Sequence, residues 1–112
     1  MKTEQPVLIT SITAAQDLSK NLFVDINGSL STNATLGVCN AETDQNEEAP
    51  VVVLGIALVL TGEAITKGNP VSSDANGKCI NGSGRVAGIA LDASTGADEL
   101  IRVLVNAVYY EI

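Results

Sequence analysis

Hydrophobic and polar residues alternate along much of this chain with the period of two that is typical of β-strands. The alternation is clearest over residues 100–112. There every second residue from Ile101 to Ala107 is aliphatic, and the residues between them include polar side chains. The aliphatic set is Ile101, Val103, Val105 and Ala107, and the opposite set includes Arg102, Asn106 and Tyr110. The pattern predicts a long closing strand with one face turned to a core.

Shorter aliphatic runs, bounded by turn residues, predict further strands at 7–12, 23–26, 36–39, 51–60 and 86–91. The run 51–60 is about half as long as a membrane-spanning helix needs to be, so we interpret it as a buried strand. Asn27-Gly28 and Asn76-Gly77 predict hairpin turns, because these residue types tolerate positive φ angles.

The second half of the chain repeats features of the first. The matched segments are 18–24 with 65–71, 27–28 with 76–77, and 36–38 with 87–89, so the separation grows from 47 to 49 to 51. Insertions of two residues keep every inward position inward. We therefore expect one domain over 13–112, built from halves of about 18–60 and 65–112, and preceded by an N-terminal arm or first strand at 1–12.

The composition favours an all-β fold. Val, Ile and Thr together number 30, whereas the chain has one Phe, two Tyr and no Trp. A core of β-branched aliphatic residues suits pleated strands. Thr13 and Gln16 have the spacing of a capping box, which predicts at most one short helical turn near Leu18.

The charges argue against nucleic acid and anionic membranes as partners. The chain has 6 basic and 13 acidic residues and a net charge of −7, and its basic residues are scattered singly. A phosphate backbone requires clustered cations, and single strands require exposed aromatic residues. Residues 1–6 are hydrophilic and give no sign of a signal peptide, so we expect synthesis in the cytoplasm. Cys39 and Cys79 are then better interpreted as buried, reduced thiols than as a disulfide.

We expect neither catalysis nor a cofactor. The chain has no histidine, which removes the usual base of nucleophile pairs and the commonest metal ligand. The spacing of Asp44, Asn46 and Glu48 resembles a calcium loop, but Ala49 and Gly55 stand where glycine and glutamate are required. A solvated acidic loop is the better interpretation of this segment.

The order of several short motifs resembles the small capsid cement, or head decoration, proteins of tailed bacteriophages. The motifs are Gly37-Val38, Gly55-Ile-Ala57, Ile65 to Val71, Gly88-Ile-Ala90, and Gly96-Ala-Asp98 followed by Ile101 to Val105. The resemblance implies a small β-barrel or tulip-like domain that assembles as a homotrimer on the outside of an icosahedral head. It also implies binding to the major capsid protein, and it carries no catalytic residues. The chain departs from the pattern in a longer acidic loop at 41–49 and a longer segment at 11–21.

Two surfaces are candidates for contacts with partners. The segment from Thr3 to Ile12 has a polar tip followed by β-prone residues, which suits the addition of a strand to a partner sheet. The docking residues that we expect are Thr3, Glu4, Gln5, Pro6, Val7, Leu8 and Ile9. An ordinary first strand is the alternative. We further expect Tyr109 and Tyr110 at a boundary between subunits of the oligomer.

A secreted carbohydrate-binding or adhesin module is the rival from another functional class, since such modules are also all-β and acidic. They usually present exposed aromatic residues for stacking on sugars and carry a leader peptide. This chain has only three aromatic residues, Phe23, Tyr109 and Tyr110.

Overall fold

The computed structural model describes residues 2–30 and 34–106, and within these ranges it contains eight β-strands and no helix. The strands are β1 (Gln5–Thr13), β2 (Phe23–Asp25), β3 (Thr35–Cys39), β4 (Glu48–Leu60), β5 (Pro70–Ser73), β6 (Cys79–Asn81), β7 (Gly88–Ala90) and β8 (Leu100–Asn106). The expected all-β fold is confirmed. Near Leu18, where a helical turn was possible, the chain instead forms an antiparallel bridge between Leu18 and Thr43.

All eight strands belong to one antiparallel sheet in the order β2-β3-β4-β8-β7-β5-β6, with β1 paired to β4. The sheet curls into a nearly closed barrel. The two outermost strands of this order, β2 and β6, come close to each other. The backbone N–H of Phe23 in β2 donates to the carbonyl of Gly77, in the turn between β5 and β6, at 2.8 Å. The barrel-like shape that the resemblance implied is therefore present.

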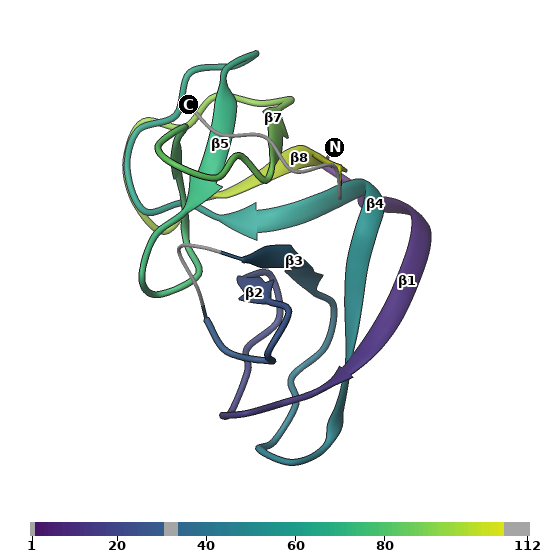
Figure 1. The fold of residues 1–112 in the computed structure, drawn as a ribbon. Helices are drawn as coiled ribbons and strands as arrows, with labels where there is room; N and C mark the ends of the chain where they lie inside the picture. The colour runs from purple at the N-terminus through teal and green to yellow at the C-terminus, as the bar shows by residue number, and fades with distance from the viewer. Residues whose placement is uncertain (1, 31–33, 107–112) are drawn as a thin grey trace.

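The long strand β4 joins the two halves of the sheet (Figure 1). Val52 pairs with Ile9 of β1 on one edge and with Val38 of β3 on the other. Gly55 likewise pairs with β1 on one edge and with β8 on the other. The strands β3 and β8 thus follow each other along one edge of β4, while β1 covers the opposite edge. Within the described residues β1 pairs with β4 alone, so its outer edge is open.

Two groups of buried hydrophobic side chains fill the interior. The group of the first half comprises Ala14, Leu18, Val24, Cys39, Ala49, Val51 and Val53. The larger, central group comprises Phe23, Val38, Val52, Ala57, Val59, Ile65, Val71, Cys79, Ala87, Ala90, Ile101, Val103 and Val105. Most of these residues are β-branched, in line with the composition. The central group contains residues from both halves, so the halves share one core.

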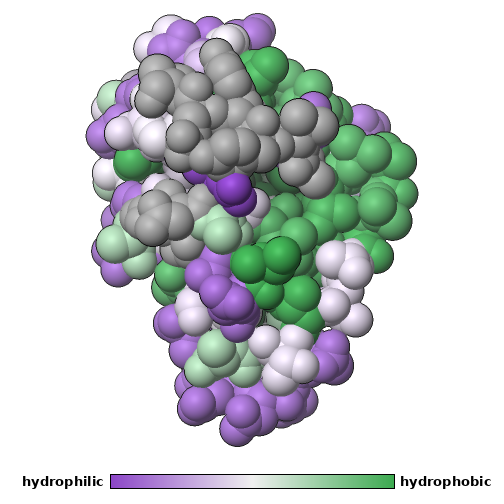
Figure 2. Space-filling model, viewed as in Figure 1, coloured by the Kyte–Doolittle hydropathy of each residue, from purple (hydrophilic) through white to green (hydrophobic). Residues whose placement is uncertain are grey.

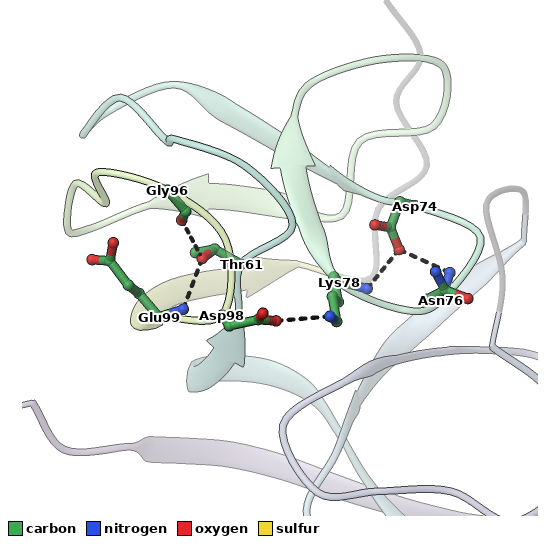
Figure 3. Close-up of polar contacts among 7 residues, drawn as sticks. All are labelled: Thr61, Asp74, Asn76, Lys78, Gly96, Asp98 and Glu99. Carbon is green, nitrogen blue, oxygen red and sulfur yellow. Dashed lines mark hydrogen bonds and ion pairs between the residues drawn. The ribbon is translucent and has the colours of Figure 1, made fainter.

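The same backbone contacts recur in the two halves. The bridge between Leu18 and Thr43 has its counterpart in the bridge between Ile65 and Ser94. The hairpin turn after β2 and the turn after β5 are closed in the same way by an aspartate at the end of the strand. Asp25 Oδ1 accepts hydrogen bonds from the backbone N–H groups of residues 27 and 29. Asp74 Oδ1 does the same for residues 76 and 78 (Figure 3).

A pair of glycines marks equivalent close contacts between strands. Gly37 of β3 pairs with Val24, and Gly88 of β7 pairs with Val71. A Cβ on Gly37 would overlap the carbonyl oxygen of Val52, and a Cβ on Gly88 would overlap that of Leu104. Each half therefore needs a residue without a side chain at this point of its sheet.

Candidate interaction surface

Strand β1 presents large aliphatic side chains to solvent. Val7 is 74% exposed, Leu8 53% and Ile9 43%. Side chains of this kind normally lie inside a protein, and here they lie along the open edge of the sheet. Of the seven docking residues expected from the sequence, residues 5–9 form the first half of this strand, and Thr3 and Glu4 immediately precede it.

An irregularity in the pairing of β1 with β4 brings Val7 to the surface. The register shifts between Pro6 and Leu8, so Val7 has no direct partner on β4. Opposite this point Gly55 has a φ of 115°, and a Cβ there would come within 2.6 Å of the Val7 backbone nitrogen. Glycine thus allows a bulge in which β1 lies very close to β4.

A second apolar surface covers the outward side of β4, β8 and β7. Leu54 is 41% exposed, Leu104 42% and Ile89 46%, and Ile56 is partly buried between them. We call these four residues the outer apolar face. Ile56 pairs with Leu104, and Leu104 pairs with Ile89, so the three side chains lie in one row across the sheet.

The outer apolar face adjoins both the open edge and a shallow hollow. Leu8 of β1 pairs directly with Leu54, which makes the two exposed surfaces continuous. Figure 2 shows extensive hydrophobic surface on the side of the molecule where β1 and β4 lie. The hollow has a volume of about 480 Å³ and is lined by Gly68, Pro70, Val86, Gly88, Ile89, Leu104 and Asn106. Its lining is uncharged.

An internal ion pair neutralises a cation on the same side of β8. Arg102 lies two residues before Leu104 and donates from Nε and Nη2 to the two carboxylate oxygens of Asp92, at 3.0 and 2.9 Å. The hydrogen bond to Arg102 lowers the pKa of Asp92 to about 2, against the opposing effect of burial. The side of β8 that carries Leu104 therefore adds little net charge to the outer apolar face.

Polar side chains fasten the loops of the second half (Figure 3). The Thr61 hydroxyl donates to the carbonyl of Gly96 at 2.8 Å and accepts from the N–H of Glu99 at 3.0 Å. Lys78 Nζ lies 2.7 Å from the carboxylate of Asp98, and this contact raises the pKa of Lys78. These polar groups supply each other's hydrogen-bond partners and hold residues 94–99 against the barrel.

The acidic loop is also tied to the body of the molecule. The carboxylate of Glu48 accepts a hydrogen bond from the Thr13 hydroxyl at 2.6 Å, and Asp17 accepts from the N–H of Gln45 at 2.8 Å. In residues 2–30 and 34–106 no three His, Cys, Asp or Glu side chains are grouped so as to hold a metal ion. Cys39 and Cys79 are buried free thiols, and burial raises the pKa of Cys79 to about 12.

Residues 2–30 and 34–106 contain one aromatic residue, Phe23, which is fully buried in the central core and cannot stack on a sugar. Tyr109 and Tyr110, expected at a subunit boundary, lie outside the described residues. The same ranges contain no helix long and apolar enough to cross a membrane.

The sequence did not single out the outer apolar face. Leu104 shares the outward positions of β8 with the polar residues Arg102 and Asn106. Leu54 lies on β4, which has aliphatic residues on both of its faces. The available signal was this double-sided hydrophobicity of β4, which is unusual for a strand with one face in water.

Comparison with known proteins identifies relatives by sequence and by fold. The model of the phage cement protein family matches residues 1–106. The crystal structure of the head fiber gp8.5 N base in bacteriophage phi29 is similar to this structure, with a TM-score of 0.70 and 16% sequence identity. The similarity covers 94% of this chain and 100% of that chain, and at this identity it shows a shared fold. No curated protein has a sequence that matches this chain.

Proposed function

Because the chain belongs to the phage cement protein family, we propose that it bridges neighbouring major capsid subunits on the outside of an icosahedral head. Its role is that of a structural, capsid-binding component of the virion. The observation that carries the bridging proposal is the open edge of β1, where three aliphatic side chains lie in solvent beside an unpaired strand edge. Adhesion is its whole activity, without catalysis or a cofactor.

The docking element is the segment from Thr3 to Ile9. An open strand edge can accept a further strand through backbone hydrogen bonds, while alternate side chains select the partner. Gln5 and Pro6 begin this edge, and Val7, Leu8 and Ile9 supply apolar area for burial against the major capsid protein. Burial of one such side chain contributes roughly 1.5–3 kcal/mol.

The protein acts as a homotrimer, with Tyr109 and Tyr110 at the boundary between subunits. A trimer that contacts several capsid subunits at once binds tightly through effective concentration, even where each contact is weak. The net charge of −7 keeps the protein away from packaged DNA and from anionic membranes, which suits a position outside the shell. Synthesis takes place in the host cytoplasm.

Binding to purified, expanded heads tests the docking element. The double variant Val7→Lys with Ile9→Lys places two charges on the open edge, where Val7 is 74% exposed and Ile9 is 43% exposed. We expect co-sedimentation with heads to fall at least tenfold, and the gain in heat resistance that the wild type gives the heads to disappear.

Ile26→Lys is the matched control, since Ile26 is 63% exposed and lies outside β1. It should bind as the wild type does. Undiminished binding of the double variant would reject the docking element, and a wild-type protein that does not attach to heads would reject the bridging role.

A further inference from the structure

Strand β1 has two parts that differ in how they pair with β4. In the second part, from Ile9 to Thr13, the pairing runs without a register shift. In the first part the register shifts between Pro6 and Leu8 and again between Leu8 and Ile9, so the ladder is interrupted on both sides of Leu8. Pro6 also has no N–H to donate to a ladder. The first part is therefore held to β4 by an interrupted pairing and the second part by a continuous one.

The first part and the residues before it contribute nothing to the core. All of residues 2–8 except Glu4 are exposed, and none belongs to either buried group. The second part is fastened more firmly, because Ile12 packs against the buried group of the first half and the Thr13 hydroxyl donates to Glu48 at 2.6 Å. Figure 1 shows β1 on the outside of the molecule, beside β4. Release of residues 2–8 from β4 thus loses little buried apolar area.

Two polar contacts hold the N-terminal end of this segment, and both lie at the surface. Lys2 Nζ donates to the carbonyl oxygen of Leu100 at 3.0 Å, and Glu4 Oε1 lies 4.0 Å from Lys20 Nζ. Exposed contacts between charged side chains contribute little to stability. The opposing contribution is conformational entropy, which every residue released from the sheet regains.

We propose that residues 2–8 form a latch, which opens at the Val7 bulge while residues 9–13 and the barrel stay folded, and that the latch docks on the head in its open form. Local openings of a protein span a wide range of free energies, and segments with few buried contacts open most readily. Leu54, Gly55 and Ile56 of β4 remain paired with β8 when the latch leaves. The barrel therefore keeps its core in the open form.

An open latch offers a partner more than a closed one. In the closed form the segment presents its outer edge, because β4 pairs with the inner edge. In the open form both edges are free to pair with a partner sheet, and seven extended residues reach about 23–25 Å from Ile9. The docking step rests on the proposed role of Thr3 to Ile9, whereas the local opening is independent of that role.

Hydrogen exchange of the backbone amides of the isolated protein, followed by NMR, tests the opening. We expect the most protected amide of residues 3–8 to exchange at least roughly a hundredfold faster than the most protected amides of residues 10–13 and 101–105. Low concentrations of urea should leave the exchange of residues 3–8 unchanged, because a local opening exposes little surface. Equal protection of residues 3–8 and 10–13, or exchange of residues 3–8 through global unfolding, would overturn the latch.

A reversible cross-link tests whether docking needs the open form. Gln5 and Ile56 are direct partners across the ladder, where Cα atoms lie about 4.5–5.5 Å apart, a separation that a disulfide spans. Gln5→Cys with Ile56→Cys is compared in its oxidised and reduced forms, which differ in the cross-link alone. Cys39 and Cys79 are buried, so they do not compete for the new thiols. Oxidation should slow the exchange of residues 5–8 and lower co-sedimentation with expanded heads, each at least about tenfold.

The matched control is a cross-link in the second part of β1. Ser11 and Pro50 are direct partners there, so oxidation of Ser11→Cys with Pro50→Cys should change neither the exchange of residues 3–8 nor binding to heads. Circular dichroism establishes that each variant is folded. If the first pair does not fold or oxidise, Lys2→Ala with Glu4→Gln removes both polar contacts and should speed the exchange of residues 3–8 roughly threefold. Unchanged exchange in that variant would count against the latch.

The two measurements separate this inference from the proposed function. If the oxidised latch variant binds heads as well as its reduced form does, docking takes place in the closed form and the inference is wrong. If the wild type does not bind heads at all, the proposed function fails and the docking step fails with it. The local opening is then still decided by the exchange of residues 3–8 in the isolated protein.

Discussion

At the scale of single residues, Gly37 and Gly88 set how closely neighbouring strands approach in the two halves. Neither has a positive φ, so the requirement for glycine comes from space alone. A methyl group at either position would meet the carbonyl oxygen of the adjacent strand and force the backbones apart. This demand explains why the two glycines recur at matching places in the sequence.

Substitution of these glycines tests the equivalence of the halves. We expect Gly37→Ala and Gly88→Ala each to reduce the free energy of unfolding by about 1–3 kcal/mol, as overpacking of a well-packed site does. Gly96→Ala is the control, because nothing lies within 4 Å of its added Cβ, and it should change stability by less than about 0.5 kcal/mol. Urea denaturation measures all three. Equal stability of Gly88→Ala and Gly96→Ala would contradict the crowding at Gly88.

The ion pair of Asp92 with Arg102 makes stability depend on pH. The pKa of Asp92 is lowered from 3.8 to about 2 in the folded protein. The unfolded chain therefore takes up a proton at a higher pH than the folded chain, and stability from this pair is present above about pH 4 and lost as the pH falls toward 2. We expect Asp92→Asn to be less stable at neutral pH and to lose less stability over this acidic range.

The measurement is the thermal midpoint of unfolding at a series of pH values between neutral and 2. Asp44→Asn is a matched control, since it removes an exposed loop carboxylate outside the pair. It should keep the wild-type profile. A profile of Asp92→Asn that runs parallel to the wild type throughout would show that the pair does not act on stability.

At the scale of the elements, the strands and turns were largely predictable. The hairpin turns at Asn27-Gly28 and Asn76-Gly77 need positive φ at their glycines, and both glycines have it. The run 51–60 is the greater part of β4, and the paired motifs fall on equivalent strands. Local conformational preference and the period of two were enough to place these elements.

The exposure of the strands could not be predicted in the same way. In β8 the predicted set Ile101, Val103 and Val105 is the buried one. β4 instead has aliphatic residues at both alternate sets of positions, so the period of two does not show which of its faces is buried. Leu54 and Val53 have similar hydrophobicity, yet Leu54 is 41% exposed and Val53 is 6% exposed. Only the packing of one half on the other decides between them. β6 was missed because its segment, Cys79–Asn81, has one large aliphatic residue, Ile80, and so shows no aliphatic run.

At the scale of the whole molecule, the two halves depend on each other. β4 belongs to both, and the central core combines Phe23, Val38 and Val52 of the first half with valines of β8. Neither half can expose its share of this core without a large loss of buried apolar area. The halves are therefore repeats in geometry but parts of one folding unit.

We expect the protein to unfold in a single cooperative transition. The calorimetric enthalpy should equal the van't Hoff enthalpy, and dichroism in the far ultraviolet should coincide with exposure of Cys39 and Cys79 to a thiol reagent. Each cysteine lies in a different buried group, so the two thiols report on both parts of the core. Reaction of one cysteine well before the other would show that the halves unfold separately.

The antiparallel pairing of β1 with β4 has a mechanical consequence. The two strands are matched without a register shift from Ile9 with Val52 to Thr13 with Glu48, and their hydrogen bonds lie perpendicular to the strand direction. A pull applied along β1 is therefore borne as shear by the whole ladder at once, instead of peeling the bonds apart one by one. A strand held in this way yields only when many bonds break together.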